Sequence, residues 1–420
     1  MNLRPVRILM FSWEYPPKAV GGIAPHVYDL TTSLASIGEE VHLVTCGEPG
    51  IPEFEQVNGV GVHRVNPYHL AAPDFITWVM QLNMAMLEKA VPLLNEPEGV
   101  HLLHAHDWLV AYAARVLKYA YRLPLVATIH ATEYGRNYGL HNSLQRYISS
   151  VEWWLAYEAW RVICCSNYMK NEVRYVFQAP GDKIRVIVNG VTPARFAVKQ
   201  GGIGRNEYAA DDEQIVFYVG RLVREKGVQV LLDAVPRILE HCPKTKFIIA
   251  GKGPYEGELR GHASRLGIAH RIYFTGYISD VVRNSLYKWA DVAVFPSLYE
   301  PFGIVALEAM AAQTPVVVSD TGGLVEIVEH GVDGLKAYPG NSRFLAGMVT
   351  QLLQDASLRG KLRFNAFRKV QKEFNWRQIA LETRQVYHGV WSEYRNTPWC
   401  ESSGQQRHFL GRVTRLLARA

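Results

Sequence analysis

The sequence predicts an α/β protein built from two doubly wound domains that face each other across a cleft. Short apolar runs rich in β-forming residues alternate with helical patterns along nearly the whole chain, and this alternation occurs twice. A glycine-rich, turn-prone stretch at 197–213 separates the two rounds, as a linker does. With 420 residues, of which 48% are hydrophobic, the chain is long enough for two sizeable cores.

The elements of the first domain, expected over 1–196, follow from the spacing of apolar residues and from turn residues. A strand at 6–11 opens it, and a helix at 24–37 comes next. Further apolar, β-rich runs bounded by turn residues predict strands at 41–45, 60–65, 101–104, 125–129, 161–165 and 184–188.

The second domain, expected over 214–375, repeats the pattern. A basic tail at 397–420 follows it, in which arginines interleave with apolar residues. The tail is either an amphipathic helix on an anionic membrane or a basic helix packed on its own domain, and its short length favours the packed form. The strands of this domain are predicted at 215–219, 246–250, 272–275, 292–295 and 316–319.

Composition narrows the class of partner. The net charge of +6 suits an anionic substrate, whereas nucleic-acid binding needs clustered Lys and Arg interleaved with aromatic residues, which the body of the chain lacks. The five cysteines have an odd count and no metal-site spacing, so we expect buried thiols rather than disulfides. Without an uncharged apolar stretch of about eighteen residues or a leader pattern, the expected location is cytoplasmic.

Two carboxylates mark the candidate site of the second domain. Glu300 lies on the loop after a predicted strand, and Glu308 lies within the apolar run 304–312. We expect a helix opened by Pro301 and Gly303 there, and a buried anion inside it needs a partner. Both carboxylates can accept hydrogen bonds from sugar hydroxyls while the helix start favours phosphate, which predicts a nucleotide-sugar ligand. The alternative is that Glu308 is an ordinary surface glutamate.

Cations and glycines follow other predicted strands. Arg221 and Lys226 are suited to neutralise the charge on a departing diphosphate, although both can also be ordinary surface residues. The pairs Gly21–Gly22 and Gly322–Gly323 each follow a strand and precede a helix, where backbone amides can approach phosphate. A plain tight turn explains the first pair as well.

Histidines cluster at the ends of two further strands. His104, His106 and Asp107 end one strand and His130 ends the next, so all four are expected at the ligand-binding edge of the sheet. A two-histidine metal site is conceivable, but the i, i+4 spacing and the carboxylate triad of familiar metal sites are missing. Neutral imidazoles that bond to sugar hydroxyls are the simpler interpretation, and we expect no metal.

In this order the motifs resemble those of the retaining glycosyltransferases of family 4, which have the GT-B fold. The resemblance covers 6–390, nearly the whole chain, and the pair Glu300 and Glu308 in the motif Pro-Ser-x-x-Glu-Pro-Phe-Gly is its most specific part. The first domain is also similar to bacterial and archaeal glycogen and starch synthases, above all in His-Ala-His-Asp-Trp at 104–108. The stretch 376–396 matches the family's C-terminal helix, which crosses back onto the first domain.

The resemblance implies a nucleotide-sugar donor, UDP-glucose or ADP-glucose, and neither a separate cofactor nor a metal. The catalytic residues would be His130 on the sugar's 6-hydroxyl, Arg221 and Lys226 on the phosphates, and Glu300 on the 3- and 4-hydroxyls. The donor site would include Gly21, Gly22, Phe302, Gly303, Ile304, Glu308, Gly322 and Gly323, with Glu308 on the ribose. Glu14, His106 and Asp107 would lie on the acceptor side.

The function expected from this resemblance is transfer of glucose to a saccharide, most simply the elongation of an α-1,4-glucan with retention of configuration. No residue is an obvious nucleophile, so the leaving diphosphate would deprotonate the incoming hydroxyl on the same face. Two alternatives stay open. One is a family-4 transferase with a lipid-linked or cell-surface acceptor, and the other is a non-catalytic carbohydrate- or nucleotide-binding protein.

Overall fold

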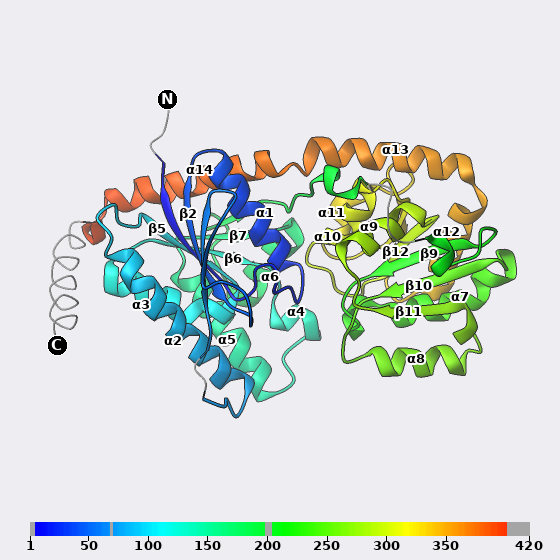
Figure 1. The fold of residues 1–420 in the computed structure, drawn as a ribbon, viewed down its shortest axis with the longest axis horizontal. Coiled ribbons are helices and arrows are strands. Elements are labelled where there is room, and N and C mark those ends of the chain that lie inside the picture. Colours follow the sequence, from blue (N-terminus) through cyan, green and yellow to red (C-terminus); the bar gives the residue numbers. More distant parts are fainter. Residues whose placement is uncertain (1–4, 68–69, 198–203, 401–420) are drawn as a thin grey trace. The chain divides into compact units, whose positions relative to one another are not determined.

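The computed structural model describes residues 5–67, 70–197 and 204–400. The chain forms two compact units. Unit 1 consists of the described residues up to Val188 and from Trp376 on, and unit 2 is Asn189–Asn375. Each unit has its own doubly wound sheet, so the predicted α/β class is confirmed (Figure 1). Most of the predicted basic tail lies outside the described residues.

The boundary predicted at 196 is wrong, because the chain leaves unit 1 after Val188. The residues just beyond it pack on unit 2, where the Val191 amide donates to the carbonyl of Phe374 at 3.0 Å. The described part of the predicted linker, 197–213, belongs to unit 2 as well, and Ala209 within it is buried. The described residues 204–213 are therefore part of unit 2 rather than a free connection.

Unit 1 is built on an eight-stranded sheet with the order β3-β4-β2-β1-β5-β6-β7-β8. Its described strands pair in parallel except for β3 and β4, which are antiparallel. The strands are β1 Arg7–Ser12, β2 Glu40–Cys46, β3 Phe54–Val57, β4 Val60–Val65, β5 Leu102–His106, β6 Leu125–Ile129, β7 Arg161–Cys164 and β8 Ile184–Val186.

Strand β3 is the strand of unit 1 that the sequence analysis missed. It forms a hairpin with β4 through Asn58 and Gly59, whose φ angles are 49° and 88°. Asn-Gly between two short strands is a strong hairpin signal, because both residues tolerate a positive φ. The signal was present in the sequence, but the exposed and half-buried residues of β3 lack the apolar run by which the other strands were found.

The helices of unit 1 cover both faces of the sheet (Figure 1). On one face, α14 packs against α1, and both bury apolar residues such as Leu30, Leu34, Ile379 and Tyr387 in one core with the strands. The chain thus returns from unit 2 to unit 1 through α14. The helices are α1 Ile23–Ser36, α2 Phe75–Leu94, α3 Ala111–Tyr121, α4 Glu133–Asn137, α5 Ser143–Glu158, α6 Asn167–Phe177 and α14 Trp376–Arg395.

Unit 2 has a six-stranded parallel sheet with the order β11-β10-β9-β12-β13-β14. Five of its strands lie where the sequence predicted them, whereas β14, which is three residues long, was not predicted. The strands are β9 Gln214–Val219, β10 Thr245–Ala250, β11 Ile272–Gly276, β12 Val292–Phe295, β13 Val316–Ser319 and β14 Leu335–Ala337.

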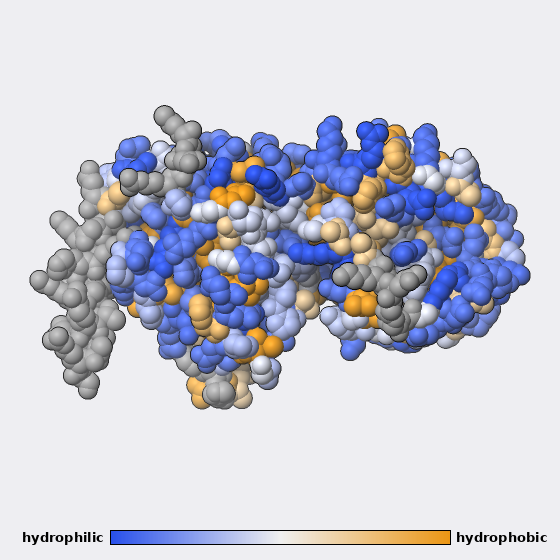
Figure 2. Space-filling view, turned by 45° about the horizontal axis from the view of Figure 1, so that its top comes forward, coloured by the Kyte–Doolittle hydropathy of each residue, from blue (hydrophilic) through white to orange (hydrophobic). Residues whose placement is uncertain are grey.

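The helices of unit 2 pack on its sheet around a core of buried Val, Leu and Ile residues. Among the described residues, no helix of either unit is both long and apolar enough to cross a membrane. On the face shown in Figure 2, hydrophobic residues lie in small groups among hydrophilic ones. The helices of unit 2 are α7 Val228–His241, α8 Glu256–Arg265, α9 Asp280–Trp289, α10 Ile304–Ala311, α11 Leu324–Ile327, α12 Ser342–Gln354 and α13 Ala356–Glu373.

The loops that follow β9 and β12 touch each other through their backbones. The amides of Leu298 and Tyr299 donate to the carbonyl of Glu225 at 2.8 and 3.2 Å. Gly227, at φ +70°, lies so close to the other loop that a Cβ on it would be 1.9 Å from the carbonyl oxygen of Pro296. Only glycine fits this position, because a side chain would both strain the backbone and push the loops apart.

We therefore expect Gly227→Ala to lower the free energy of unfolding by about 2 kcal/mol or more, measured by urea denaturation. Gly257→Ala in α8 is the matched control, because a Cβ there meets no atom within 4 Å. The control should keep or slightly raise stability, since Ala favours helix. Equal stability of the two variants would contradict the close contact of the loops.

Candidate functional site

The sheet of unit 2 has a switch point between β9 and β12. The chain adds β10 and β11 on one side of β9, then crosses over and adds β12, β13 and β14 on the other side. Open α/β sheets bind ligands at such a point, beyond the carboxyl ends of the strands. Lys226 follows β9, Glu300 follows β12 and Gly322 follows β13. The topology therefore brings the predicted donor-site segments of this unit to one edge.

Lys226 and Glu300 form a partly buried ion pair at this edge. The ammonium group of Lys226 donates to both carboxylate oxygens of Glu300 at 2.9 and 2.7 Å, and the hydroxyl of Ser297 donates to Oε2 at 3.0 Å. The side chain of Glu300 is 8% exposed and that of Lys226 is 19% exposed. A carboxylate this buried needs such partners. Lys226, which was predicted to bind phosphate, is therefore held by Glu300, which was predicted to bind the sugar.

Arg221 is placed differently from Lys226. Its side chain is 43% exposed and its guanidinium lies 3.6 Å from a carboxylate oxygen of Glu225. A pair this open to solvent contributes little to stability. The Arg221 backbone is fixed, because its carbonyl accepts a hydrogen bond from the hydroxyl of buried Tyr218 at 3.1 Å. The arginine thus presents an exposed cation from a well-held loop.

The glycine pair after β13 supports the Glu300 loop by close packing. A Cβ on Gly322, which has φ +56°, would lie 1.9 Å from the carbonyl oxygen of Glu300. The amide of Gly323 donates to that same oxygen at 2.8 Å. The prediction that both glycines contact phosphate therefore needs a correction, because the Gly323 amide is already bonded to the protein.

The helix after Glu300 begins later than predicted. Helix α10 starts at Ile304, and Gly303 is its N-cap residue with φ 112°. Pro301 lies before the cap, so it does not open the helix, whereas Phe302 is buried beside it. The first amides of a helix have no partner within the helix and carry its positive dipole end. This end lies three residues along the chain from the paired carboxylate of Glu300.

Glu308 is held inside unit 2 and is not an ordinary surface residue. Its side chain is 12% exposed, and Arg283 of α9 lies 3.7 Å from Oε1. The hydroxyl of Tyr287, one turn further along α9, donates to Oε2 at 3.3 Å. Burial, and then the nearby Glu308 carboxylate, raises the pKa of this hydroxyl well above its usual value, so it stays a donor. The sequence analysis missed Arg283 and Tyr287, because nothing local links α9 to Glu308.

Unit 1 also has a switch point, between β1 and β5. Strand β2 and the pair β3–β4 extend the sheet on one side of β1, and β5 to β8 extend it on the other side. The loop after β1 carries Glu14 and the glycine pair Gly21–Gly22, β5 ends in His106 and Asp107, and His130 follows β6. The predicted residues of the first domain therefore share one edge of their sheet.

Glu14 and Gly21 hold the loop after β1 together. The carboxylate of Glu14 is buried, and its Oε2 accepts hydrogen bonds from the amides of Val20 at 2.5 Å and Gly21 at 3.1 Å. Gly22 caps α1, and its carbonyl accepts a hydrogen bond from the His26 amide at 3.2 Å. This corrects the prediction for Gly21, because its amide is engaged by Glu14 rather than open to phosphate. The acceptor-side role of Glu14 stays a prediction.

Asp107 has an unusual backbone and a buried carboxylate. Its φ of 59° and ψ of 176° fall in a backbone region that residues other than glycine rarely adopt. The side chain accepts a hydrogen bond from the backbone amide of His130 at 2.7 Å, which holds the two strand ends together. Burial raises the pKa of Asp107 to about 6, although Arg136 and this hydrogen bond act against the rise. The carboxylate is therefore mostly ionised at neutral pH.

Three histidines meet next to Asp107. Nδ1 of His106 lies 3.1 Å from Nε2 of His130, and the His26 ring of α1 lies against both, at centroid distances of 5.4 and 4.7 Å. Burial lowers the pKa of His130 to about 3 and holds that of His106 well below its usual value. The rings of His106 and His130 are therefore neutral at physiological pH. His104 is bonded elsewhere, to Tyr387 at 2.7 Å and Thr128 at 2.8 Å.

The third histidine, His26, was not considered in the prediction that no metal is bound. That prediction considered two strand-end histidines and overlooked His26, which lies in the first turns of α1. Its position directly after the Gly21–Gly22 turn, at the same sheet edge, was the signal that could have found it. Together the three side chains place ligand nitrogens within 4.8 Å of one another.

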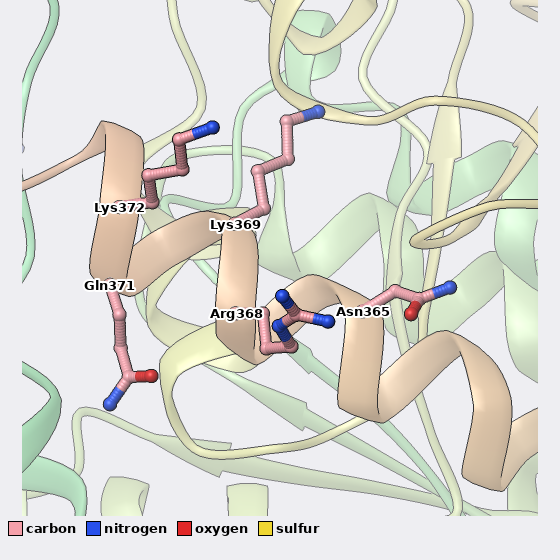
Figure 3. A pocket seen from close by; sticks show the side chains of 5 residues that line it. All are labelled: Asn365, Arg368, Lys369, Gln371 and Lys372. Atoms are coloured by element: carbon pink, nitrogen blue, oxygen red, sulfur yellow. The ribbon is translucent and has the colours of Figure 1, made fainter.

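A separate hollow lies on the surface of unit 2 along α13 (Figure 3). It encloses about 420 Å³ and is lined by Asn365, Arg368, Lys369, Gln371 and Lys372. Lys369 is paired with Asp333 at 2.9 Å, and its ammonium also donates to the carbonyl of Ile327 at 2.6 Å. No predicted site residue lines the hollow, so we do not include it in the candidate site.

Comparison with known families and sequences places the chain among sugar-transferring proteins. The model described as Glycosyltransferase Family 4 matches residues 20–195, and that described as Glycosyl transferases group 1 matches residues 204–369. An uncharacterized glycosyltransferase of Methanocaldococcus jannaschii is 41% identical over 91% of this chain and 98% of its own length. A glycogen synthase of Mycobacterium tuberculosis is 36% identical over 91% of this chain and 94% of its own length.

Solved structures agree with this placement. A sucrose-phosphate synthase from Thermosynechococcus elongatus superposes with a TM-score of 0.78 and 26% identity, over 92% of this chain and all of the other. The catalytic domain of starch synthase IV from Arabidopsis thaliana, bound to ADP and acarbose, superposes with a TM-score of 0.74 and 16% identity, over 92% of this chain and all of the other. At that identity the second likeness shows the fold alone.

The buried ion pair of unit 2 predicts a strong energetic coupling. Lys226→Met should lower the free energy of unfolding by about 2 kcal/mol or more, because it leaves the Glu300 carboxylate buried without its cation. The double variant Lys226→Met with Glu300→Gln should lose clearly less than the two single variants combined. We expect a coupling energy of about 1 kcal/mol or more in this cycle, measured by urea denaturation.

The pair Lys244 and Asp212 is the matched control. Its N–O distance is also 2.7 Å, but its side chains are 69% and 62% exposed. The same cycle of substitutions there should show no measurable coupling, because solvent screens the charges. Similar coupling in the two pairs would contradict the burial of the Glu300 carboxylate.

Proposed function

Since this chain belongs to the glycosyltransferases of family 4, which have the GT-B fold, we propose that it moves glucose from a nucleoside-diphosphate donor onto a saccharide and elongates an α-1,4-glucan. The relative named glycogen synthase, 36% identical over nearly the whole chain, supports this acceptor. A structural neighbour bound to UDP-glucose, with a TM-score of 0.72, supports the donor class. The cytoplasmic location expected from the sequence is part of the same proposal.

The observation that carries the proposal is the ion pair of Lys226 and Glu300 at the switch point of unit 2. A carboxylate fixed there by a cation and a hydroxyl keeps lone pairs for sugar hydroxyls, because each oxygen can accept more than one hydrogen bond. The ammonium can at the same time face a phosphate. We propose that Glu300 meets the 3- and 4-hydroxyls of the glucosyl group while Lys226 is shared between Glu300 and the diphosphate.

The remaining donor contacts follow from the same edge. Arg221 offers an exposed guanidinium to the diphosphate, and the start of α10 at Gly303 and Ile304 adds backbone amides and the helix dipole. Glu308, held by Arg283 and Tyr287, would accept the two ribose hydroxyls. In this proposal the fixed cations supply the positive charge that the departing diphosphate needs, so transfer requires no metal and no cofactor besides the nucleotide sugar.

The proposed chemistry retains the anomeric configuration. The bond between the glucosyl C1 and the diphosphate oxygen breaks, and the acceptor oxygen bonds to C1 on the same face. The proton of the acceptor hydroxyl passes to the leaving diphosphate oxygen. Glu300 is bonded to Lys226 and Ser297 and would orient hydroxyls rather than attack C1. In unit 1, we assign the acceptor side to Asp107 and His106, and the bond to the sugar 6-hydroxyl stays a prediction for His130.

The test of this function is nucleotide release from purified protein with UDP-glucose, ADP-glucose or GDP-mannose, each without acceptor, with glycogen or with glucose 1-phosphate. We expect release from one glucose donor that rises strongly with glycogen. A response to glucose 1-phosphate alone would favour a maltose-1-phosphate product, as the name of a 28% identical relative suggests. Indifference to both acceptors would favour a lipid-linked or cell-surface acceptor, and no release from any donor would favour a binding protein.

The role of Arg221 can be separated from folding. Arg221→Ala should lower kcat by about 100-fold, because one preorganised charge is lost from the leaving diphosphate. The melting temperature should not change, since the side chain is 43% exposed. Arg224→Ala is the matched control, because Arg224 is an exposed cation of the same loop and has no proposed role. Equal kcat values in the two variants would contradict the assignment of Arg221.

A further inference from the structure

The three histidines of unit 1 come from different elements and converge. His26 lies on α1, His106 ends β5, and His130 directly follows β6. Their ligand nitrogens lie within 4.8 Å of one another. Nδ1 of His106 and Nε2 of His130 are 3.1 Å apart. Two nitrogens bound to one tetrahedral zinc ion at about 2.0–2.1 Å would be about 3.3 Å apart, so this pair already has nearly the spacing of metal ligands.

His106 offers the cluster a single ring nitrogen. An imidazole binds a metal ion through one nitrogen, because its two ring nitrogens point in different directions. His106 is fully buried, and its Nε2 has no hydrogen-bond partner among the described residues. Nδ1 is the nitrogen that faces His130, so Nδ1 is the candidate ligand atom of His106 and Nε2 takes no part in holding the ion.

The surroundings hold the three rings in place. Asp107 accepts the backbone amide of His130 at 2.7 Å, and the Trp376 ring lies against His26 at a centroid distance of 5.6 Å. The His104 ring lies against that of His106 at a centroid distance of 4.3 Å, and its own nitrogens are hydrogen-bonded to a tyrosine and a threonine. His104 therefore supports the cluster without competing as a ligand. His130 is only half-buried, so an ion can reach the cluster from solvent.

We propose that His26, His106 and His130 form a binding site for a divalent transition-metal ion such as Zn²⁺ or Co²⁺. Three imidazoles suit these ions, whereas Mg²⁺, Ca²⁺ and Mn²⁺ prefer oxygen ligands. The fourth position of a tetrahedral ion is open to water or a small ligand. One consequence rests on the proposed function: a bound ion occupies His130, so it competes with the sugar and slows transfer instead of assisting it.

The test uses the full chain, freed of metal by a chelator and then dialysed. Titration with CoCl₂ is followed by visible absorption, and titration with ZnCl₂ by calorimetry. We expect one ion per chain, with the intense visible bands of tetrahedral cobalt. The chain has five cysteines, so the near-ultraviolet bands of cobalt–thiolate bonds must be absent. Failure of wild-type protein to bind either ion at micromolar concentration, or the presence of thiolate bands, would overturn the proposal.

Variants identify the ligands. His106→Gln and His130→Gln should each weaken Zn²⁺ binding by about 100-fold or more, because loss of a ligand costs at least as much as loss of a group that supports one. His130 is half-buried, so its variant is informative if the fully buried His106 variant fails to fold, as judged by circular dichroism. Unchanged binding in a folded His130→Gln protein would contradict the site.

His63→Gln is the matched control. Nε2 of His63 lies 3.1 Å from Nδ1 of His42, the same spacing as in the cluster, but this pair belongs to no group of three ligands among the described residues. Zn²⁺ binding should be unchanged in this variant. Loss of Zn²⁺ binding would show that the ion binds at His42 and His63 rather than at the proposed cluster. Binding is measured without donor or acceptor, so its failure would leave the proposed transferase function untouched, and the reverse also holds.

Discussion

The site of unit 2 depends on the ion pair between Lys226 and Glu300. The two residues are 74 positions apart, yet the ammonium group donates to both carboxylate oxygens. A carboxylate that is 8% exposed is costly without a cation, so the loops after β9 and β12 have to stay together. The close backbone contact at Gly227 makes this approach possible, since a Cβ there would overlap the carbonyl oxygen of Pro296. Gly322, after β13, packs in the same way against the carbonyl oxygen of Glu300. The ion pair and the backbone packing therefore stabilise each other at the switch point, where the order of the strands reverses.

The corresponding sheet edge of unit 1 is held together mainly by neutral groups rather than by an ion pair. Its sheet edge carries three histidines, of which burial keeps His106 and His130 uncharged, and the carboxylate of Asp107 is tied to the backbone of His130. The network continues through His104 to Tyr387 on α14, which is 283 positions away along the chain. A low-dielectric setting strengthens such hydrogen bonds and penalises any that are missing. The unpartnered nitrogen of His106 is notable for this reason.

The two edges differ in the chemistry that they offer. Unit 2 combines exposed and paired cations with two held carboxylates, which suits the hydroxyls and the charged diphosphate of a nucleotide sugar. Unit 1 offers neutral imidazoles, which bond to hydroxyls or to a transition metal but do not balance a phosphate charge. The amides of Gly21 and Gly323, which had been assigned to ligands, instead hold loops in place. Several motif residues therefore act by shaping the site rather than by touching what it binds.

Local patterns in the sequence determined the alternation of strands and helices, the α/β class and the placing of Lys226, Glu300, Asp107 and His130 on the segments that follow strands. These features depend on neighbouring residues, through the period of apolar side chains and the backbone preferences of Gly and Pro. Only the tertiary structure decided which strand ends are neighbours, because strand order is set by packing across the whole sheet. That order paired Lys226 with Glu300, brought Arg283 to Glu308, occupied the Gly323 amide and added His26 to the histidine cluster.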